Sequence, residues 1–248
     1  INIFPNDIDI VTGGFPCQDF SIAGKRKGFE SEKGHDGKKL DVDAPSIESR
    51  GQLYMWMREV ISIVQPKVFV AENVKGLITA NKGKAIETII KDFESIAPGY
   101  VVKPHLYNFA EYGVPQFRER ILFVGVRIDT GFNFNHPLPT HGPNGKLPYV
   151  TAGEALVGVK DVSYNNELIN IKEKTKKMLE MIPEGGNFRD IPEDSPYHVK
   201  GMISHVYRRL KLDEPAKTII AAGGGGTWGY HYPEPRPLTN RERARLQS

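Results

Sequence analysis

The sequence predicts an α/β fold with a mostly parallel sheet, followed by a smaller region of different character. Two observations support this fold class. Short apolar runs alternate with amphipathic stretches through residues 1–127, which is the pattern of strands joined by crossover helices. After Arg127, the segment DTGFNFNHPLPTHGPNGKLPYV is crowded with Pro, Gly, Asn and His, which indicates a change of domain.

The first elements are a strand, a helix and a second strand. The run DIDIVT at residues 7–12 is typical of a short buried strand, and PKVFVAENV at residues 66–74 is typical of another. Residues 52–64 between them have apolar side chains at helical spacing. Two strands joined by a helix are expected to lie parallel in one sheet, with a right-handed crossover. The expected apolar stripe of the helix consists of Leu53, Trp56, Met57, Val60, Ile61 and Val64.

The same pattern continues along the chain. A second helix is expected at residues 84–96, and YVVKPHLYNF and RILFVGVR are expected to be strands. Only one further helix is predicted in the later region, near residues 168–181. The run KTIIAAGGGGTWGYH reads as a strand followed by glycines, and RPLTNRERARLQS opens a basic helix, because Thr239 and Glu242 have the spacing of a capping box. The apolar face of the second helix comprises Ile86, Ile89, Ile90, Phe93 and Ala97.

Composition excludes several classes of protein. No apolar run reaches the length of a membrane span and no signal peptide is evident, so we expect a soluble, cytoplasmic protein. A single cysteine excludes an intramolecular disulfide, and the seven histidines show no paired spacing, so no metal is expected. The net charge of +3 permits a nucleic-acid partner without indicating one. The chain starts without Met and stops just inside a predicted helix, so we expect it to be part of a longer protein.

Two reactive side chains follow the ends of the predicted parallel strands. We expect Cys17 to stand just past the end of the first strand and Glu72 just past the end of the second. Ligands of such sheets bind beyond the carboxyl ends of the strands, so the thiol and the carboxylate are expected to share one edge. There they could serve as a nucleophile and as an acid or hydrogen-bond partner. The alternatives are a cysteine that is only a small buried residue and a carboxylate that is only solvated.

The surroundings of Cys17 favour a reactive thiol. Gly13, Gly14 and Pro16 predict a stiff turn that presents the cysteine at its tip. Three cations follow closely in the sequence and would favour the thiolate. They are Lys25, Arg26 and Lys27.

Five separated stretches resemble the cytosine-C5 DNA methyltransferases of bacterial modification systems. In order they are GGFPCQDFSIAGKRKGF, RGQL, PKVFVAENVKGL, YGVPQFRERILFVGVR and RPLTNRERARLQS. The resemblance implies the doubly wound, Rossmann-like fold of S-adenosylmethionine-dependent methyltransferases, incomplete in this chain. It also implies a catalytic domain at residues 1–127, a smaller target recognition domain at 128–216 and a return segment at 217–248. The glycine-rich cofactor strand and the closing Asn-containing motif of the family are not among these stretches.

The resemblance assigns catalytic roles to four residues. Cys17 would add to carbon 6 of a cytosine flipped out of duplex DNA, so that carbon 5 can take the methyl group of S-adenosylmethionine. Glu72 would hold and protonate the ring at N3. Arg120 would contact the base carbonyl oxygen and steady Glu72, while Arg118 would support the surrounding loop.

The resemblance also assigns binding residues and partners. Pro16 and Leu53 match positions that touch the cofactor. The implied partners are double-stranded DNA and a cognate restriction endonuclease, with no membrane and no metal. The residues that match DNA-contacting positions are Gln18, Ser21, Lys25, Arg26 and Gln116.

Two other functions remain open from the sequence. One is the RNA-modifying branch of the same family, which uses the same catalytic residues, although the varied segment after Arg127 favours recognition of duplex sequence. Another is a DNA-binding relic without catalysis, against which the four catalytic residues argue. A cysteine hydrolase is disfavoured because no histidine is evidently placed to activate Cys17.

Overall fold

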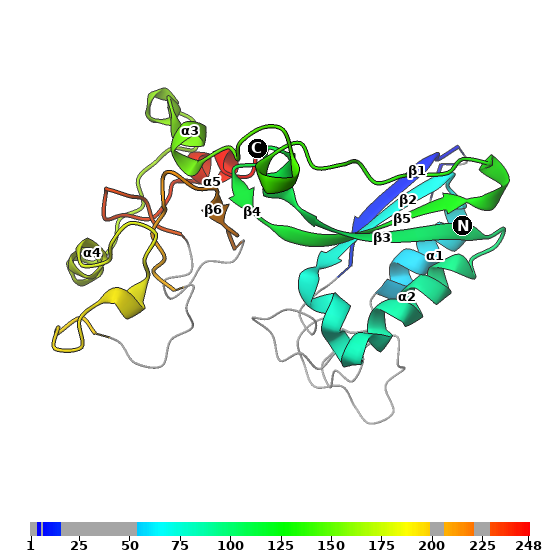
Figure 1. Cartoon of the computed structure of the whole chain (residues 1–248), viewed down its shortest axis with the longest axis horizontal. Helices are drawn as coiled ribbons and strands as arrows, with labels where there is room; N and C mark the ends of the chain where they lie inside the picture. The colour runs from blue at the N-terminus through cyan, green and yellow to red at the C-terminus, as the bar shows by residue number, and fades with distance from the viewer. Residues whose placement is uncertain (1–3, 6, 16–53, 199–205, 221–228) are drawn as a thin grey trace. The chain divides into compact units, whose positions relative to one another are not determined.

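The computed structural model describes residues 4–5, 7–15, 54–198, 206–220 and 229–248 (Figure 1). The chain divides into two compact units. Unit 1 comprises Ile1–Tyr107 and Glu119–Pro137, and unit 2 comprises Asn108–Arg118 and Leu138–Ser248. The ranges 1–127, 128–216 and 217–248 were assigned by expected function, whereas these units are defined by compactness. The functional domain boundaries therefore stay a prediction.

Unit 1 is built on a four-stranded sheet with the order β1-β2-β5-β3. Its strands are β1 (Ile10–Gly14), β2 (Val68–Val74), β3 (Tyr100–Asn108) and β5 (Glu119–Arg127). β1 pairs with β2 in parallel, as the sequence predicts, and β5 pairs with β2 in the antiparallel direction. The described sheet is therefore mixed.

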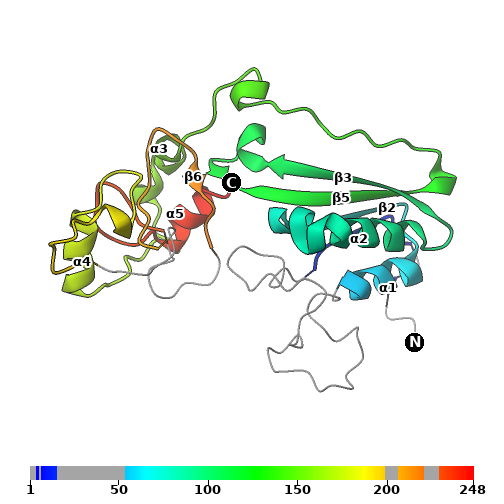
Figure 2. The same ribbon diagram turned by 60° about the horizontal axis from the view of Figure 1, so that its bottom comes forward.

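Two helices, α1 (Tyr54–Val64) and α2 (Lys84–Glu94), lie along the sheet (Figure 2). Both contribute to one core with the inward side chains of β2 and β5, including Phe69 and Phe123. A 3₁₀ segment at Lys75–Gly83 links β2 to α2. The α/β fold predicted from the sequence is thus confirmed.

The apolar stripes predict the buried helix faces only in part. In α2, Ile89 and Phe93 are fully buried as expected, whereas Ala97 lies beyond the helix end and is exposed. In α1, the side chain of Trp56 is 59% exposed, which corrects the prediction. Ile61 is buried as expected, and Tyr54, which is outside the predicted stripe, is buried as well. Trp56 lies two residues from Tyr54, or about 200° around the helix.

Unit 2 contains little regular structure. β4 (Gln116–Phe117) pairs in parallel with β6 (Ala216–Lys217), and the helices are α3 (Ala152–Leu156), α4 (Glu173–Glu180) and α5 (Asn240–Arg245). The expectation of a single helix before the final one was wrong, because α3 is also present. Both α3 and α5 begin at capping boxes, so α3 carries the same local signal that predicted α5.

Arg209 joins several parts of unit 2. Its guanidinium donates to four backbone carbonyls, at 2.7–3.1 Å. The Arg209 side chain also lies over the ring of Tyr232, 4.7 Å from the ring centre. Arg209 is only 4% exposed, and three of its four bonds are buried, so those three carbonyls have little access to water as an alternative partner. The four carbonyls belong to Leu179, Ile182, His231 and Pro233.

None of the helices in the described ranges is both long and apolar enough to cross a membrane.

Replacing Arg209 with alanine should lower the free energy of unfolding by about 3 kcal/mol or more, because buried carbonyls lose charged donors. Urea denaturation measures this loss. The matched control is Arg189→Ala, since Arg189 is exposed and the change should stay within about 0.5 kcal/mol. Equal losses in the two variants would show that Arg209 does not hold these segments together.

Candidate active site

The candidate site lies where β1 and β2 end side by side. The strand register pairs Gly14, the last residue of β1, with Glu72. Glu72 belongs to β2 itself rather than following it, and Gly13 and Gly14 belong to β1. The prediction that the two glycines form a turn was therefore wrong, because both still pair with β2. The Glu72 carboxylate lies at the end of the sheet where β1 stops, and Cys17 lies outside the described residues, so a shared edge stays a prediction.

Arg120 of β5 holds the Glu72 carboxylate. Its Nε lies 2.7 Å from Oε1 of Glu72, and its Nη1 donates to the carbonyl of Glu119 at 2.8 Å. Arg120 pairs with Val74 in the register, so it is the diagonal neighbour of Glu72 on the same face of the sheet. The Arg120 side chain is 14% exposed and that of Glu72 is 39% exposed. The arginine is thus mostly covered by protein, while the carboxylate stays accessible.

The second carboxylate oxygen of Glu72 faces Gly14. A Cβ atom on Gly14 would lie 3.0 Å from Oε2 of Glu72, which is closer than ordinary van der Waals contact. One carboxylate oxygen is therefore engaged by Arg120, and the other lies over the bare backbone of β1.

Asn73 was missed by the sequence reasoning. It is fully buried, its Nδ2 donates to the carbonyl of Phe15 at 3.1 Å, and its Oδ1 accepts from the amide of Val74 at 2.9 Å. Phe15 is also buried and is the last described residue before Cys17 in the sequence. The sequence signal for the role of Asn73 was its position in the largely apolar strand VFVAENV. An amide buried there needs polar partners, which predicts hydrogen bonds to nearby backbone. Neighbouring residues of β2 thus perform two tasks, with Glu72 on one face and Asn73 on the other.

The side chains of Phe15 and Tyr54, which are far apart in the sequence, pack against one another. Their ring centres are 6.1 Å apart, and both side chains are buried. The Tyr54 hydroxyl donates to Asp92 of α2 at 2.5 Å. Burial and this hydrogen bond raise the pKa of Tyr54 well above its ordinary value, so the phenol stays protonated. The start of α1 is therefore fixed beside the end of β1.

Arg118 and Gln116 belong to unit 2, whereas Arg120 belongs to unit 1. Arg118 lies between two strands, because β4 ends at Phe117 and β5 begins at Glu119. The carbonyl of Arg118 accepts from the amide of Phe109 at 3.0 Å.

Gln116 is fully buried, and both ends of its amide are engaged. Its Nε2 donates to the backbone carbonyl of Leu246 at 3.1 Å, and its Oε1 accepts from the backbone amide of Ile219 at 3.2 Å. A contact between the Gln116 side chain and DNA would require these two bonds to open.

Seven predicted site residues lie outside the described residues. They are Pro16, Cys17, Gln18, Ser21, Lys25, Arg26 and Leu53. The structure therefore describes the carboxylate half of the candidate site. In the part of the chain that the structure covers, no group of three or more His, Cys, Asp or Glu side chains could hold a metal ion.

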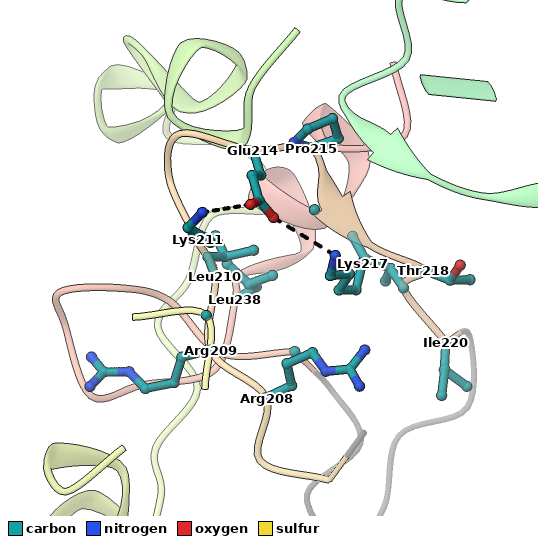
Figure 3. A pocket seen from close by; sticks show the side chains of 14 residues that line it. Arg208, Arg209, Leu210, Lys211, Glu214, Pro215, Lys217, Thr218, Ile220 and Leu238 are labelled. Atoms are coloured by element: carbon teal, nitrogen blue, oxygen red, sulfur yellow. Dashed lines mark hydrogen bonds and ion pairs between the residues drawn. The ribbon is translucent and has the colours of Figure 1, made fainter. Parts of the chain in front are cut away.

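Unit 2 contains a separate pocket with cationic side chains along its lining (Figure 3). Lys211 and Lys217 both approach Glu214, at 2.5 and 3.8 Å. Arg208 also lines the pocket. Burial lowers the pKa of its guanidinium, but the ordinary pKa of arginine is so high that the group remains charged. The run YRRLK at residues 207–211 thus supplies Arg208 and Lys211 to this pocket, while Arg209 also anchors the fold.

The chain matches known proteins over nearly all its length. A model of the family described as C-5 cytosine-specific DNA methylase matches residues 1–248. Type II methyltransferase M.NgoFVII of Neisseria gonorrhoeae is 61% identical over 245 residues, which cover 98% of this chain and 60% of that protein. Type II methyltransferase M.BbvI of Brevibacillus brevis is 45% identical over 246 residues, which cover 98% of this chain and 60% of that protein. The chain thus spans about 60% of the length of these curated relatives.

A solved structure supports the same fold. The chain matches an Escherichia coli prophage protein, described as a DNA modification methyltransferase, with a TM-score of 0.58. The sequences are 20% identical, and the match covers 97% of this chain and 68% of that one, so it bears on the fold alone. The methyltransferase fold predicted from the sequence is confirmed. With the family model matching along residues 1–248, the chain belongs to the C-5 cytosine-specific DNA methylase family.

Proposed function

We propose that the full-length protein methylates carbon 5 of cytosine within a specific sequence of duplex DNA, as the modification enzyme of a restriction system. The observation that carries this proposal is the Glu72–Arg120 pair on the sheet edge where β1 leads into the segment of Cys17. The names of the relatives, which are Type II methyltransferases, favour the DNA branch of the family over the RNA branch. An intact ion pair also argues against a relic without catalysis.

The proposed reaction begins with the Cys17 thiolate, which attacks carbon 6 of cytosine and forms a sulfur–carbon bond. Electrons of the ring then move toward N3, where Glu72 provides a proton. Arg120 keeps the carboxylate in place for this contact, because its guanidinium binds the other oxygen. After carbon 5 is methylated, N3 returns its proton to Glu72, and loss of the carbon-5 proton to solvent water allows the sulfur–carbon bond to break. Cys17 and Glu72 are thereby restored.

S-adenosylmethionine, the methyl donor that the family implies, supplies an electrophilic methyl group when bound. Pro16 and Leu53 would hold it. The structure fits this assignment because their chain neighbours, Phe15 and Tyr54, are buried against one another. Phe15 and Tyr54, the described residues next to Pro16 and Leu53 in the sequence, therefore lie together in the core of unit 1.

The target base must leave the duplex to reach such a site. We assign contacts with the opened DNA to Gln18, Ser21, Lys25 and Arg26, since hydroxyl, amide and cationic side chains suit phosphates and base edges. We assign the reading of sequence to residues 128–216, which lie outside the catalytic motifs. Exchanging this range for that of a relative with another target should change the methylated sequence, and an unchanged sequence would refute the assignment.

Duplex DNA with 5-fluorocytosine at the target should trap the full-length protein covalently, because fluorine cannot leave as a proton does. Cys17→Ser should abolish the adduct, as measured by denaturing gel electrophoresis. An adduct that persists in Cys17→Ser would mean that another residue is the nucleophile.

Replacing Arg120 with methionine should lower kcat by on the order of a hundredfold, since a misplacement of about 1 Å can have that effect. Steady-state methylation assays measure the loss. The matched control is Lys75→Met, which removes the neighbouring Lys75–Glu119 pair at 2.7 Å. Both of those side chains are about half exposed, so activity should change little. Similar losses in the two variants would contradict a specific role for Arg120.

A further inference from the structure

Gly13 and Gly14 end β1 without a backbone reason to be glycine. Neither has the positive φ that glycine alone adopts readily, whereas eight other described glycines do. Glycine within a strand loses more conformational freedom on folding than other residues, and it often marks a close approach by another group. The two glycines therefore need an explanation from the space around them.

The two positions face different neighbours. A Cβ atom on Gly13 would lie 3.3 Å from the sulfur of Met57 in α1. A Cβ atom on Gly14 would lie 3.0 Å from Oε2 of Glu72. Among the described residues, apart from those adjoining Gly14, the backbone carbonyl of Glu72 is the only other heavy atom within 4 Å, at 3.9 Å. Gly13 thus meets a flexible thioether that can move aside. Gly14 meets the carboxylate of the candidate active site.

We propose that Gly14 is a positioning residue for Glu72, because the missing side chain leaves the space that the carboxylate occupies. Arg120 holds Oε1 from the β5 side, and the bare backbone of Gly14 accommodates Oε2 on the β1 side. Parallel pairing sets Gly14 directly beside Glu72, so this space lies next to the carboxylate. The catalytic consequence rests on the proposed function, whereas the geometric claim does not.

A methyl group at position 14 would have to displace the carboxylate by roughly a few tenths of an ångström to restore ordinary contact. Since about 1 Å of misplacement can cost on the order of a hundredfold in rate, a loss near tenfold is expected. Fold stability should hardly change, because the displaced group is the accessible end of a side chain.

The test compares Gly14→Ala with Gly13→Ala in the full-length protein. Gly14→Ala should lower kcat about tenfold and leave the KM for DNA within about twofold, while Gly13→Ala should keep both within about twofold of the parent. A purely structural role would instead lower the melting temperature. Equal kcat in the two variants would overturn the proposal.

A second readout does not depend on activity. The NMR signal of the Arg120 Nε–H group, assigned by its loss in Arg120→Lys, should shift in Gly14→Ala and stay in place in Gly13→Ala. An unmoved signal in Gly14→Ala would overturn the proposal even if kcat fell. If the parent protein shows no methylation of any DNA, the proposed function fails, and this signal still decides the role of Gly14.

Should Gly14→Ala destabilise the protein, the same change is made in a Glu72→Ala background. The melting temperature should then be unaffected by the alanine at position 14, because the carboxylate that it meets is gone. A similar loss in both backgrounds would show that Gly14 serves the strand rather than Glu72.

Discussion

The register between β1 and β2 determines where the chemistry of this chain can take place. Parallel pairing sets Gly14 beside Glu72, so the end of one strand meets the carboxylate of the next. Antiparallel pairing of β5 on the other side of β2 then brings Arg120 diagonally to the same carboxylate. A shift of one residue in the pairing of β5 with β2 would turn Arg120 to the opposite face and separate the ion pair, and a shift in the pairing of β1 with β2 would move Gly14 away from Glu72.

Side chains alternate between the two faces of the sheet along β2, so the successive residues Glu72 and Asn73 have different roles. Glu72 lies on the accessible face, where its oxygens meet Arg120 and the space over Gly14. Asn73 points into the core and binds the carbonyl of Phe15. The same strand therefore positions the carboxylate and anchors the backbone that leads toward Cys17. Because both tasks depend on one short strand, the core of unit 1 beneath β2 supports the candidate site directly.

Local and periodic signals in the sequence predicted much of this structure. The α/β fold, the parallel pairing of β1 and β2, the buried face of α2 around Ile89 and the capped start of α5 were all predictable from spacing and capping residues. The direction of β5 was not, because pairing between distant strands leaves no local mark. The bond from Asn73 to Phe15 and the space at Gly14 likewise depend on residues 58 positions apart in the chain. The exposed Trp56 shows that apolar character alone does not select the buried face of a helix.

Site-specific methylation by the full-length protein is the central claim, and bisulfite sequencing tests it most directly. The complete gene is expressed in a host that lacks cytosine methylation, and the host DNA is sequenced after bisulfite treatment. Cytosines protected from conversion in one short sequence context, and converted elsewhere, are the result that the structure and its family predict. Conversion of cytosines in every context would contradict the account.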